Sequence, residues 1–187
     1  VAEVLQYIAD GIKIKAAEAD AMYAGIVIDT NNFTNQTGVR TFEAAAFLRR
    51  NGADVTRVRK LFRDDMQDYK ARAAAISSAE IYREAFSIGV CPSEGLPSPT
   101  IVCAQAANEL LEIKGIKASV VMTEYHGLIY LSARSIDEVN VQVMMEKLGG
   151  GGHRTIAGAQ LSGISMEEAK DRVKAVIDEM LQKGDIS

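Results

Sequence analysis

The sequence of 187 residues contains no tryptophan, three prolines, two histidines and two cysteines. Two cysteines are too few for the disulfide framework of a small secreted domain, and both Cys91 and Cys103 have apolar neighbours. We therefore expect two buried, reduced thiols. The sequence also lacks an apolar run long enough to cross a bilayer and lacks a charged, then apolar leader. We expect a segment that lies in the cytoplasm and makes no membrane contact.

An excess of one charge is also missing, because 21 basic and 25 acidic residues give a net charge of −4. Hydrophobic residues make up 48% of the chain, which is typical of a globular protein with a core. The mild negative charge argues against a protein that coats nucleic acid by charge alone, although it permits a local basic groove. The chain opens without methionine, and Val4, Leu5 and Ile8 already form one helical face, which suggests a segment of a larger protein.

The first 66 residues predict helices, with caps and turn formers between them. Helices are expected over residues 18–28, over 42–50 with Thr41 as N-cap, after Asp54, and from Asp65 to about Ala75. The remaining residues, 67–187, alternate between strand and helix patterns.

In this second part, Ser165 and Glu168 form a capping-box pair at the start of the last helix. The other expected elements are a strand over 79–91, a helix over 101–113, a hairpin of 117–123 with 128–133, a short helix over 139–148 and a strand over 155–161. The sequence thus predicts an α/β protein, with a helical part (1–66) followed by a small mixed-sheet α/β domain (67–187).

Four glycines and a histidine, Gly149–His153, form the most distinctive motif. One glycine is enough to end a helix, and each further glycine costs backbone entropy on folding. Glycines let a ligand approach the main chain, and successive free N–H groups can form an anion-binding nest. His153 adds a hydrogen-bond donor or a positive charge at the same place. A flexible loop with an exposed histidine is the alternative, but the attached histidine and the flanking strands favour phosphate binding.

Two further polar residues follow the strand expected over 128–133. Arg134 ends that strand with a planar, permanently charged group that suits phosphate, although alone it would be an ordinary surface arginine. Asn140 precedes a helical turn, where it can cap the helix or bind a base or a phosphate. From its position alone, capping is the safer interpretation of Asn140.

Asp29 ends an apolar stretch and is followed by polar residues. Metal-binding carboxylates often occupy such a position at the end of an apolar stretch, but helix-capping residues occupy it more commonly. The sequence has no nucleophile elbow, no Cys-x-x-Cys pair, no Walker-type loop and no pair of histidines at metal-ligand spacing. His126, in the expected hairpin turn, is expected to be exposed.

These motifs are similar to the C-terminal part of the DHH superfamily of phosphoesterases. Residues 25–30 and 37–45 resemble the last conserved block of the DHH domain. Residues 132–135, 140–142 and 149–153 resemble the DHH-associated C-terminal domain. The block 37–45 points to the GdpP-type (YybT-type) branch, the cyclic di-AMP phosphodiesterases, and the resemblance covers essentially the whole chain.

The resemblance implies a hydrolase that cleaves phosphodiester bonds with two Mn²⁺ ions, which activate a water and stabilise charge on the phosphate. It implies that Asp29 is a metal ligand, and also a homodimer and a parent protein with upstream membrane helices. The residues that it implies for binding a cyclic dinucleotide or short nucleotide are Arg134, Ser135, Asn140, Gly150, Gly151, Gly152 and His153.

The Asp-His-His motif that names the superfamily is absent from this sequence. One aspartate cannot hold two ions, so we expect the chain alone to have no phosphodiesterase activity. Two alternatives remain open. The chain could belong to another DHH enzyme, a short-oligonucleotide exonuclease (RecJ-like or nanoRNase) or a polyphosphatase, because these share the fold. It could also be a non-catalytic module with weak nucleic-acid binding, like the related domain of alanyl-tRNA synthetases, although it lacks a run of basic and aromatic residues.

Overall fold

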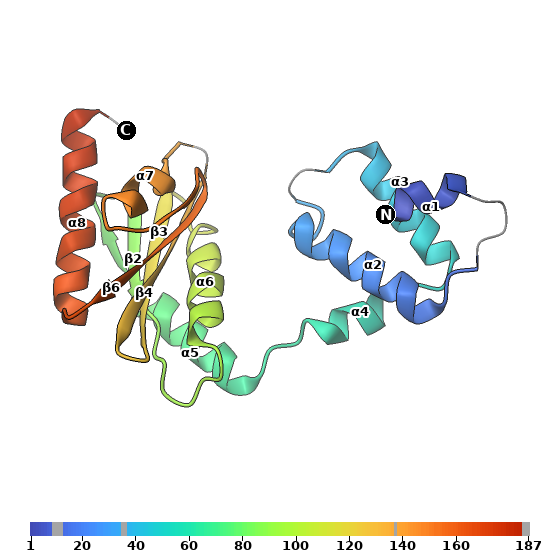
Figure 1. Cartoon of the computed structure of the whole chain (residues 1–187), viewed down its shortest axis with the longest axis horizontal. Coiled ribbons are helices and arrows are strands. Elements are labelled where there is room, and N and C mark those ends of the chain that lie inside the picture. The colour runs from blue at the N-terminus through green and yellow to red at the C-terminus, as the bar shows by residue number, and fades with distance from the viewer. Residues whose placement is uncertain (9–12, 35–36, 137, 185–187) are drawn as a thin grey trace. The chain divides into compact units, whose positions relative to one another are not determined.

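The structure is a computed structural model that describes residues 1–8, 13–34, 37–136 and 138–184. The chain forms two compact units, Val1–Arg63 and Asp64–Ser187. Figure 1 labels their helices and strands. The first unit is helical and the second contains a mixed sheet with helices, so the predicted α/β class is confirmed.

Small side chains form the core of the first unit. Its described helices are α1 (Ala2–Ile8), α2 (Ala16–Asp29), α3 (Val39–Arg50) and α4 (Val55–Leu61). Ala19, Leu48 and Ala53 are almost fully buried between them. Nε of Arg57 donates to Oδ2 of Asp20 at 2.7 Å and thereby links α4 to α2.

The start of α3 differs from the prediction that Thr41 is its N-cap. The helix begins at Val39, with Gly38 as the N-cap residue. The hydroxyl of Thr41 accepts a hydrogen bond from the N–H of Gly38 at 3.3 Å, because Thr41 lies in the first turn. Thr41 therefore supports the helix start from inside the helix rather than from the cap position.

The second unit forms one sheet in its described residues, with strand order β1-β2-β3-β4-β6-β5. Its elements are α5 (Met66–Ser77), β1 (Glu80–Tyr82), β2 (Phe86–Val90), α6 (Pro99–Leu110), β3 (Ala118–Tyr125), β4 (Leu128–Ser135), α7 (Val141–Glu146), β5 (Gly151–His153), β6 (Ile156–Ser162) and α8 (Met166–Lys183). β2 and β3 run parallel, with α6 as their crossover, and the other neighbouring strands run antiparallel.

Helices cover the two faces of this sheet unequally (Figure 1). On one face, α7 and α8 close the main core over side chains such as Val120, Leu131 and Ala159. On the other face, α6 packs against β3 and α5, around the buried side chains of Val121, Cys103 and Leu110 and their neighbours. The predicted cap of the last helix is confirmed, because the hydroxyl of Ser165 accepts from the N–H of Glu168 at 3.2 Å.

The strand predicted over residues 79–91 is two strands, β1 and β2, which pair as a hairpin. The turn uses Arg83 and Glu84, with φ of 49° and 63°. Neither residue is one that normally marks a left-handed turn, so the pattern gave no turn signal. Tyr82 and Arg83 are fixed by Asp178 of α8, whose carboxylate accepts from both at 2.8 Å.

A buried arginine near the start of the second unit forms ion pairs with two carboxylates. Arg72 of α5 is 9% exposed. Its Nη2 lies 2.5 Å from Oδ2 of Asp64 and its Nε lies 2.6 Å from Oε1 of Glu109, and Nη1 donates to Gln105 at 3.1 Å. Two carboxylates therefore compensate the charge of this desolvated guanidinium.

Both cysteines are buried free thiols, as predicted: Cys91 is 1% exposed and Cys103 is fully buried. No helix in the described part of the chain is long and apolar enough to cross a membrane.

Candidate functional site

The strands β4, β6 and β5 leave part of one sheet face uncovered. Burial alternates along β4 and along β6, so that every second residue lies in the core under α7 and α8. The residues between them point to the other face, where α6 covers β3 and part of β4. We call the uncovered part the open face. It carries Tyr130, Ile156, Gly158, Gln160, Gly151 and His153, and Ser132 and Arg134 lie at its border with α6.

The strand register arranges the open face in three rows, since directly paired residues of antiparallel strands share a face. Arg134 pairs with Ile156, and Ile156 pairs with His153. We call these three residues the arginine row. The glycine row consists of Ser132, Gly158 and Gly151, and the tyrosine row consists of Tyr130 and Gln160. Rows two residues apart along a strand are separated by about 7 Å.

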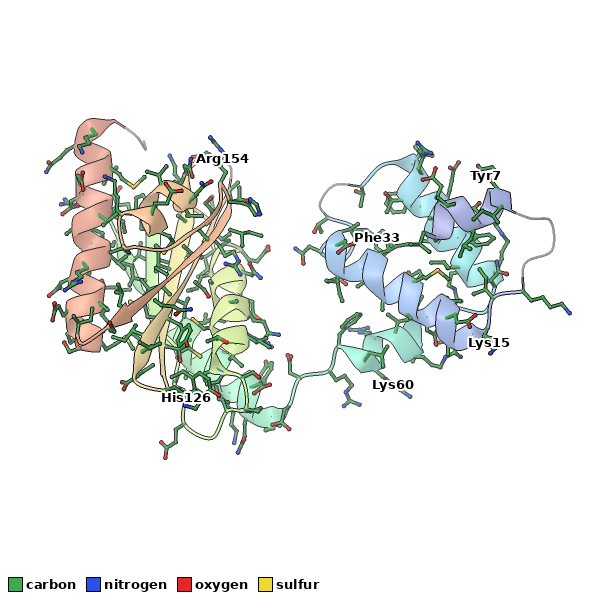
Figure 2. All side chains as sticks on the ribbon, viewed as in Figure 1. Tyr7, Lys15, Phe33, Lys60, His126 and Arg154 are labelled. Carbon is green, nitrogen blue, oxygen red and sulfur yellow. The ribbon has the colours of Figure 1, made fainter. Side chains whose placement is uncertain are left out.

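Figure 2 locates the two ends of these strands. Arg154, in the turn between β5 and β6, lies at one end of the sheet, and His126, in the turn between β3 and β4, lies at the other. The arginine row is next to the Arg154 end. Arg134 and His153 are two strand spacings apart, or about 10 Å between their backbones. Two basic side chains thus flank Ile156 at one end of the open face.

Arg134 is held in place, but none of the carboxylates in the described part of the chain compensates its charge. Its Nε donates to Oδ1 of Asn108 at 2.9 Å, and its Nη1 donates to the carbonyl of Ala133 at 2.9 Å. Desolvation by burial lowers the pKa of this half-buried guanidinium, which nonetheless remains charged. Both described partners are neutral oxygens, and no carboxylate of the described residues pairs with Arg134.

Arg72 and Arg134 differ in how the charges of their guanidinium groups are compensated. Two carboxylates accompany the buried guanidinium of Arg72, whereas the acceptors of Arg134 among the described residues are two neutral oxygens. A desolvated charge without a counter-charge costs free energy that a bound anion would recover. The open face therefore has the chemistry of an anion site centred on Arg134.

Asn108, near the C-terminal end of α6, is a residue that sequence reasoning missed. It lies in a helix predicted from apolar periodicity, and no local motif distinguishes it. Its contact with Arg134 spans 26 residues of sequence and exists only because α6 packs beside β4. A long-range contact of this kind leaves no signal in a single sequence.

The glycine run serves mainly to bring backbones together, which corrects its interpretation as an anion nest. The N–H of Gly149 donates to the carbonyl of Glu146 at 3.0 Å, and that of Gly150 donates to Met145 at 2.8 Å, so neither is free. Gly149 ends α7 with φ of +79°. The rest of the run, Gly151–His153, is the strand β5.

Steric contacts explain why β5 and its approach are glycine. A Cβ on Gly150 would overlap the carbonyl oxygen of Gly158, and one on Gly152 would lie 2.5 Å from the carbonyl oxygen of Ile156. A Cβ on Gly151, by contrast, would meet no atom within 4 Å. Gly151 is thus the member of the run that leaves space on the open face itself.

Two of the predicted binding residues lie elsewhere. The hydroxyl of Ser135 is buried and donates to the carbonyl of Val139 at 2.6 Å, on the core side of β4. Oδ1 of Asn140 caps α7 by accepting from the N–H groups of Gln142 (3.1 Å) and Val143 (3.4 Å). Ser135 and Asn140 therefore hold the loop that leads to α7, and the structure does not bring them to the open face. Arg134, Gly151 and His153 are brought together there.

Asp29, the predicted metal ligand, is exposed at the last position of α2. The next residue, Thr30, closes the helix through its hydroxyl, which donates to Ile26 at 2.6 Å. Three successive residues, Asn31–Phe33, then have φ of 44°, 56° and 65°. Among the described residues, no group of three or more histidine, cysteine, aspartate or glutamate side chains is placed to hold a metal ion. The residues described here do not fit a two-metal centre.

Part of the chain matches a known domain family, and nearly the whole chain is similar to named phosphodiesterases. A family model for the DHHA1 domain matches residues 98–183. The chain is 42% identical, over 98% of its length, to the "Cyclic-di-AMP phosphodiesterase GdpP" of Bacillus subtilis, and it covers 28% of that protein. It is 40% identical, over 95% of its length, to the "Cyclic-di-AMP phosphodiesterase PdeA" of Listeria monocytogenes, and it covers 27% of that protein.

Among solved structures, an exopolyphosphatase-related protein from Bacteroides fragilis matches with a TM-score of 0.79. The match covers 89% of this chain and 51% of that chain at 22% sequence identity, so it supports the fold alone.

Residues 98–183 form a DHHA1 domain. The chain is similar along nearly its whole length to part of the cyclic di-AMP phosphodiesterases of the GdpP type. The predicted resemblance is confirmed. The chain spans only about a quarter of the length of these relatives.

Proposed function

We propose that this chain is the substrate-binding C-terminal part of a phosphodiesterase that hydrolyses cyclic di-AMP. The observation that carries the proposal is the half-buried guanidinium of Arg134, which has no carboxylate partner among the described residues and borders the open face that also carries His153. The identity of 42% to a cyclic di-AMP phosphodiesterase supports the choice of a cyclic dinucleotide as the anion.

In this proposal the open face binds and orients a phosphate group. Arg134 donates to non-bridging phosphate oxygens with the N–H groups that its two described acceptors do not use. His153 donates from β5, two strands away, to the same phosphate or to the adjacent one. Gly151 keeps the neighbouring glycine row free of a side chain on β5, so that the sugar-phosphate backbone can lie close to the sheet there.

Two Mn²⁺ ions, the metals of the resembling family, would supply the activation of water in the parent enzyme. The described residues of this chain do not fit that centre, so we assign no chemical step to it here. We propose that Asp29 contributes one ligand and that residues outside this chain contribute the others. The chain alone is then expected to bind its ligand without hydrolysing it.

Calorimetric titration of cyclic di-AMP into the 187-residue chain tests the binding proposal. We expect Arg134→Ala and His153→Ala each to weaken binding, and Arg134→Ala to do so by about tenfold or more, because a hydrogen bond to a charged group is lost. Ser162→Ala is the matched control, since this exposed residue lies on the same face at the far end of β6. Equal affinities for all four proteins would exclude the open face as the binding site.

Hydrolysis assays on the full-length parent protein test the substrate. We expect Mn²⁺-dependent turnover of cyclic di-AMP to exceed that of short RNA and of polyphosphate. Faster turnover of short RNA would identify an oligonucleotide exonuclease instead, and faster turnover of polyphosphate would identify a polyphosphatase. Hydrolysis of cyclic di-AMP by the 187-residue chain alone would contradict the assignment of most metal ligands to other residues.

We also propose that the parent protein is a homodimer, that this segment lies in the cytoplasm, and that membrane helices in another part of the parent anchor it. The resemblance to the cyclic di-AMP phosphodiesterases supports these three points. Sedimentation of the full-length protein in detergent and membrane fractionation test them, and a monomeric or fully soluble parent would contradict them.

A further inference from the structure

A pocket lies next to the glycine row, at a distance from Arg134. Its volume is about 540 Å³. Its lining residues are Tyr130, Leu131, Gly149, Gly150, Gly158, Ala159 and Gln160. Three of these residues are glycines, so much of the pocket surface is bare backbone. The side chains of the tyrosine row, Tyr130 and Gln160, stand directly opposite each other on the open face.

These two side chains are suited to different parts of a nucleobase. Tyr130 is half-buried and has Tyr125 beside it, with ring centroids 6.4 Å apart. Aromatic side chains of this kind stack on bases without regard to their identity. Gln160 is exposed, and its amide offers one acceptor and two donors. An amide can donate to N7 of adenine and accept from its 6-amino group at the same time, but guanine presents two acceptors at those positions.

The tyrosine row and the arginine row are far enough apart to contact different parts of one dinucleotide. The tyrosine row and the arginine row are four residues apart along β4, which corresponds to a distance of about 14 Å. The glycine row lies between them and contains only Ser132, Gly158 and Gly151. No large side chain therefore stands between the phosphate site at Arg134 and the pocket at Tyr130, and a sugar can lie across the small residues.

We propose that the tyrosine row is a base subsite that selects adenine, with Tyr130 as the stacking residue and Gln160 as the residue that determines specificity. The inference rests on the proposed function, because it takes the phosphate at Arg134 as the anchor. The ligand class is an adenine dinucleotide, which places its phosphate at the arginine row and one of its bases against Tyr130 and Gln160.

Titration of the 187-residue chain with the linear dinucleotides pApA and pGpG tests this subsite. We expect the unmodified chain to bind pApA about tenfold or more tighter than pGpG. Gln160→Ala should abolish that preference. Tyr130→Ala should weaken both ligands by about tenfold, whereas Tyr130→Phe, which keeps the ring, should bind like the unmodified chain. Ser162→Ala is again the control and should retain both the affinity and the preference.

The outcomes separate this inference from the proposed function. If the chain binds both dinucleotides equally, loses both with Arg134→Ala and is unaffected by Gln160→Ala, the base subsite is refuted while phosphate binding stands. If the chain binds neither dinucleotide, the proposed function itself fails. Circular dichroism of each variant confirms folding, and Tyr130→Phe tests the stacking role without removing a buried ring.

Discussion

Asn108 of α6 holds the guanidinium of Arg134 through a single hydrogen bond of 2.9 Å between Oδ1 and Nε. The bond joins α6, which covers part of this sheet face, to β4, which borders the open face. It positions the arginine without neutralising it, since an amide carries no charge. Whether position 108 carries an amide or a carboxylate should therefore change how strongly Arg134 binds an anion.

We predict that Asn108→Asp weakens binding of an anionic ligand more than Asn108→Ala does. The alanine variant only frees the guanidinium to change rotamer, with an expected loss of a few-fold, about 0.5–1.5 kcal/mol. The aspartate variant supplies the missing counter-charge and competes with the ligand, so its affinity should fall further although its fold should be as stable. Titration with cyclic di-AMP and thermal unfolding of both variants measure the two effects. Tighter binding by Asn108→Asp would contradict the positioning role.

Two neighbouring glycines should respond differently to the same substitution. Gly150→Ala should lower the free energy of unfolding by about 1–3 kcal/mol or more, because the new Cβ overlaps the carbonyl of Gly158. Gly151→Ala should fold almost normally, because its Cβ meets no atom within 4 Å, yet it should weaken ligand binding by occupying the open face. Urea denaturation and ligand titration of this matched pair separate packing from recognition. A stable, tightly binding Gly150→Ala protein would disagree with the observed backbone approach.

The two thiols should be inert in the folded protein. Desolvation by burial raises the pKa of Cys91 to about 11 and that of Cys103 to about 12, so that almost no reactive thiolate is present near pH 8. We expect Ellman's reagent to detect no rapid reaction in buffer and two thiols in denaturant. Rapid reaction of one thiol in buffer would show that the α6 side of the sheet opens locally.

Glu179 of α8 should make stability depend on pH at the acid end. Hydrogen bonds from Lys183 and Lys147 lower its pKa from an ordinary value near 4.5 to about 2. Because the folded-state pKa is the lower one, these ion pairs stabilise the fold above about pH 4.5 and lose their effect as the pH falls toward 2. The melting temperature of Glu179→Gln should lie below that of the unmodified protein at pH 7, and the difference should shrink in acid. Glu112→Gln, on the exposed turn after α6, is the control.

Elements with a regular pattern and a recognisable cap were predictable from the sequence. The last helix has both, in Ser165 and in the apolar face that includes Val173 and Ile177. The hairpin of β3 and β4 followed from two β-branched runs around a turn. The hairpin of β1 and β2 did not, because its left-handed turn residues are Arg83 and Glu84 rather than glycine or asparagine.

The site was predictable only where one segment carries it. The glycine-histidine motif is contiguous and therefore recognisable in the sequence, although the amides of Gly149 and Gly150 form hydrogen bonds within the protein. The partnership of Arg134 with Asn108, and the facing pair Tyr130 and Gln160, depend on sheet register and helix packing. The position of Ser135 on the core side of β4 could not be predicted for a related reason: neighbours on a strand point to opposite faces, and only the fold shows which face is open.

The ion pair between Asp64 and Arg72 bears on how this chain can be shortened. A chain that begins at Asp64 keeps both carboxylates around the buried arginine, together with Asp65, whose side chain caps α5 by accepting from Gln67 at 2.8 Å. A chain that begins at Gln67, after the boundary predicted from sequence, loses the cap and one of the two counter-charges. We therefore expect the chain that begins at Asp64 to be the more stable of the two and the better choice for crystallisation or ligand screening.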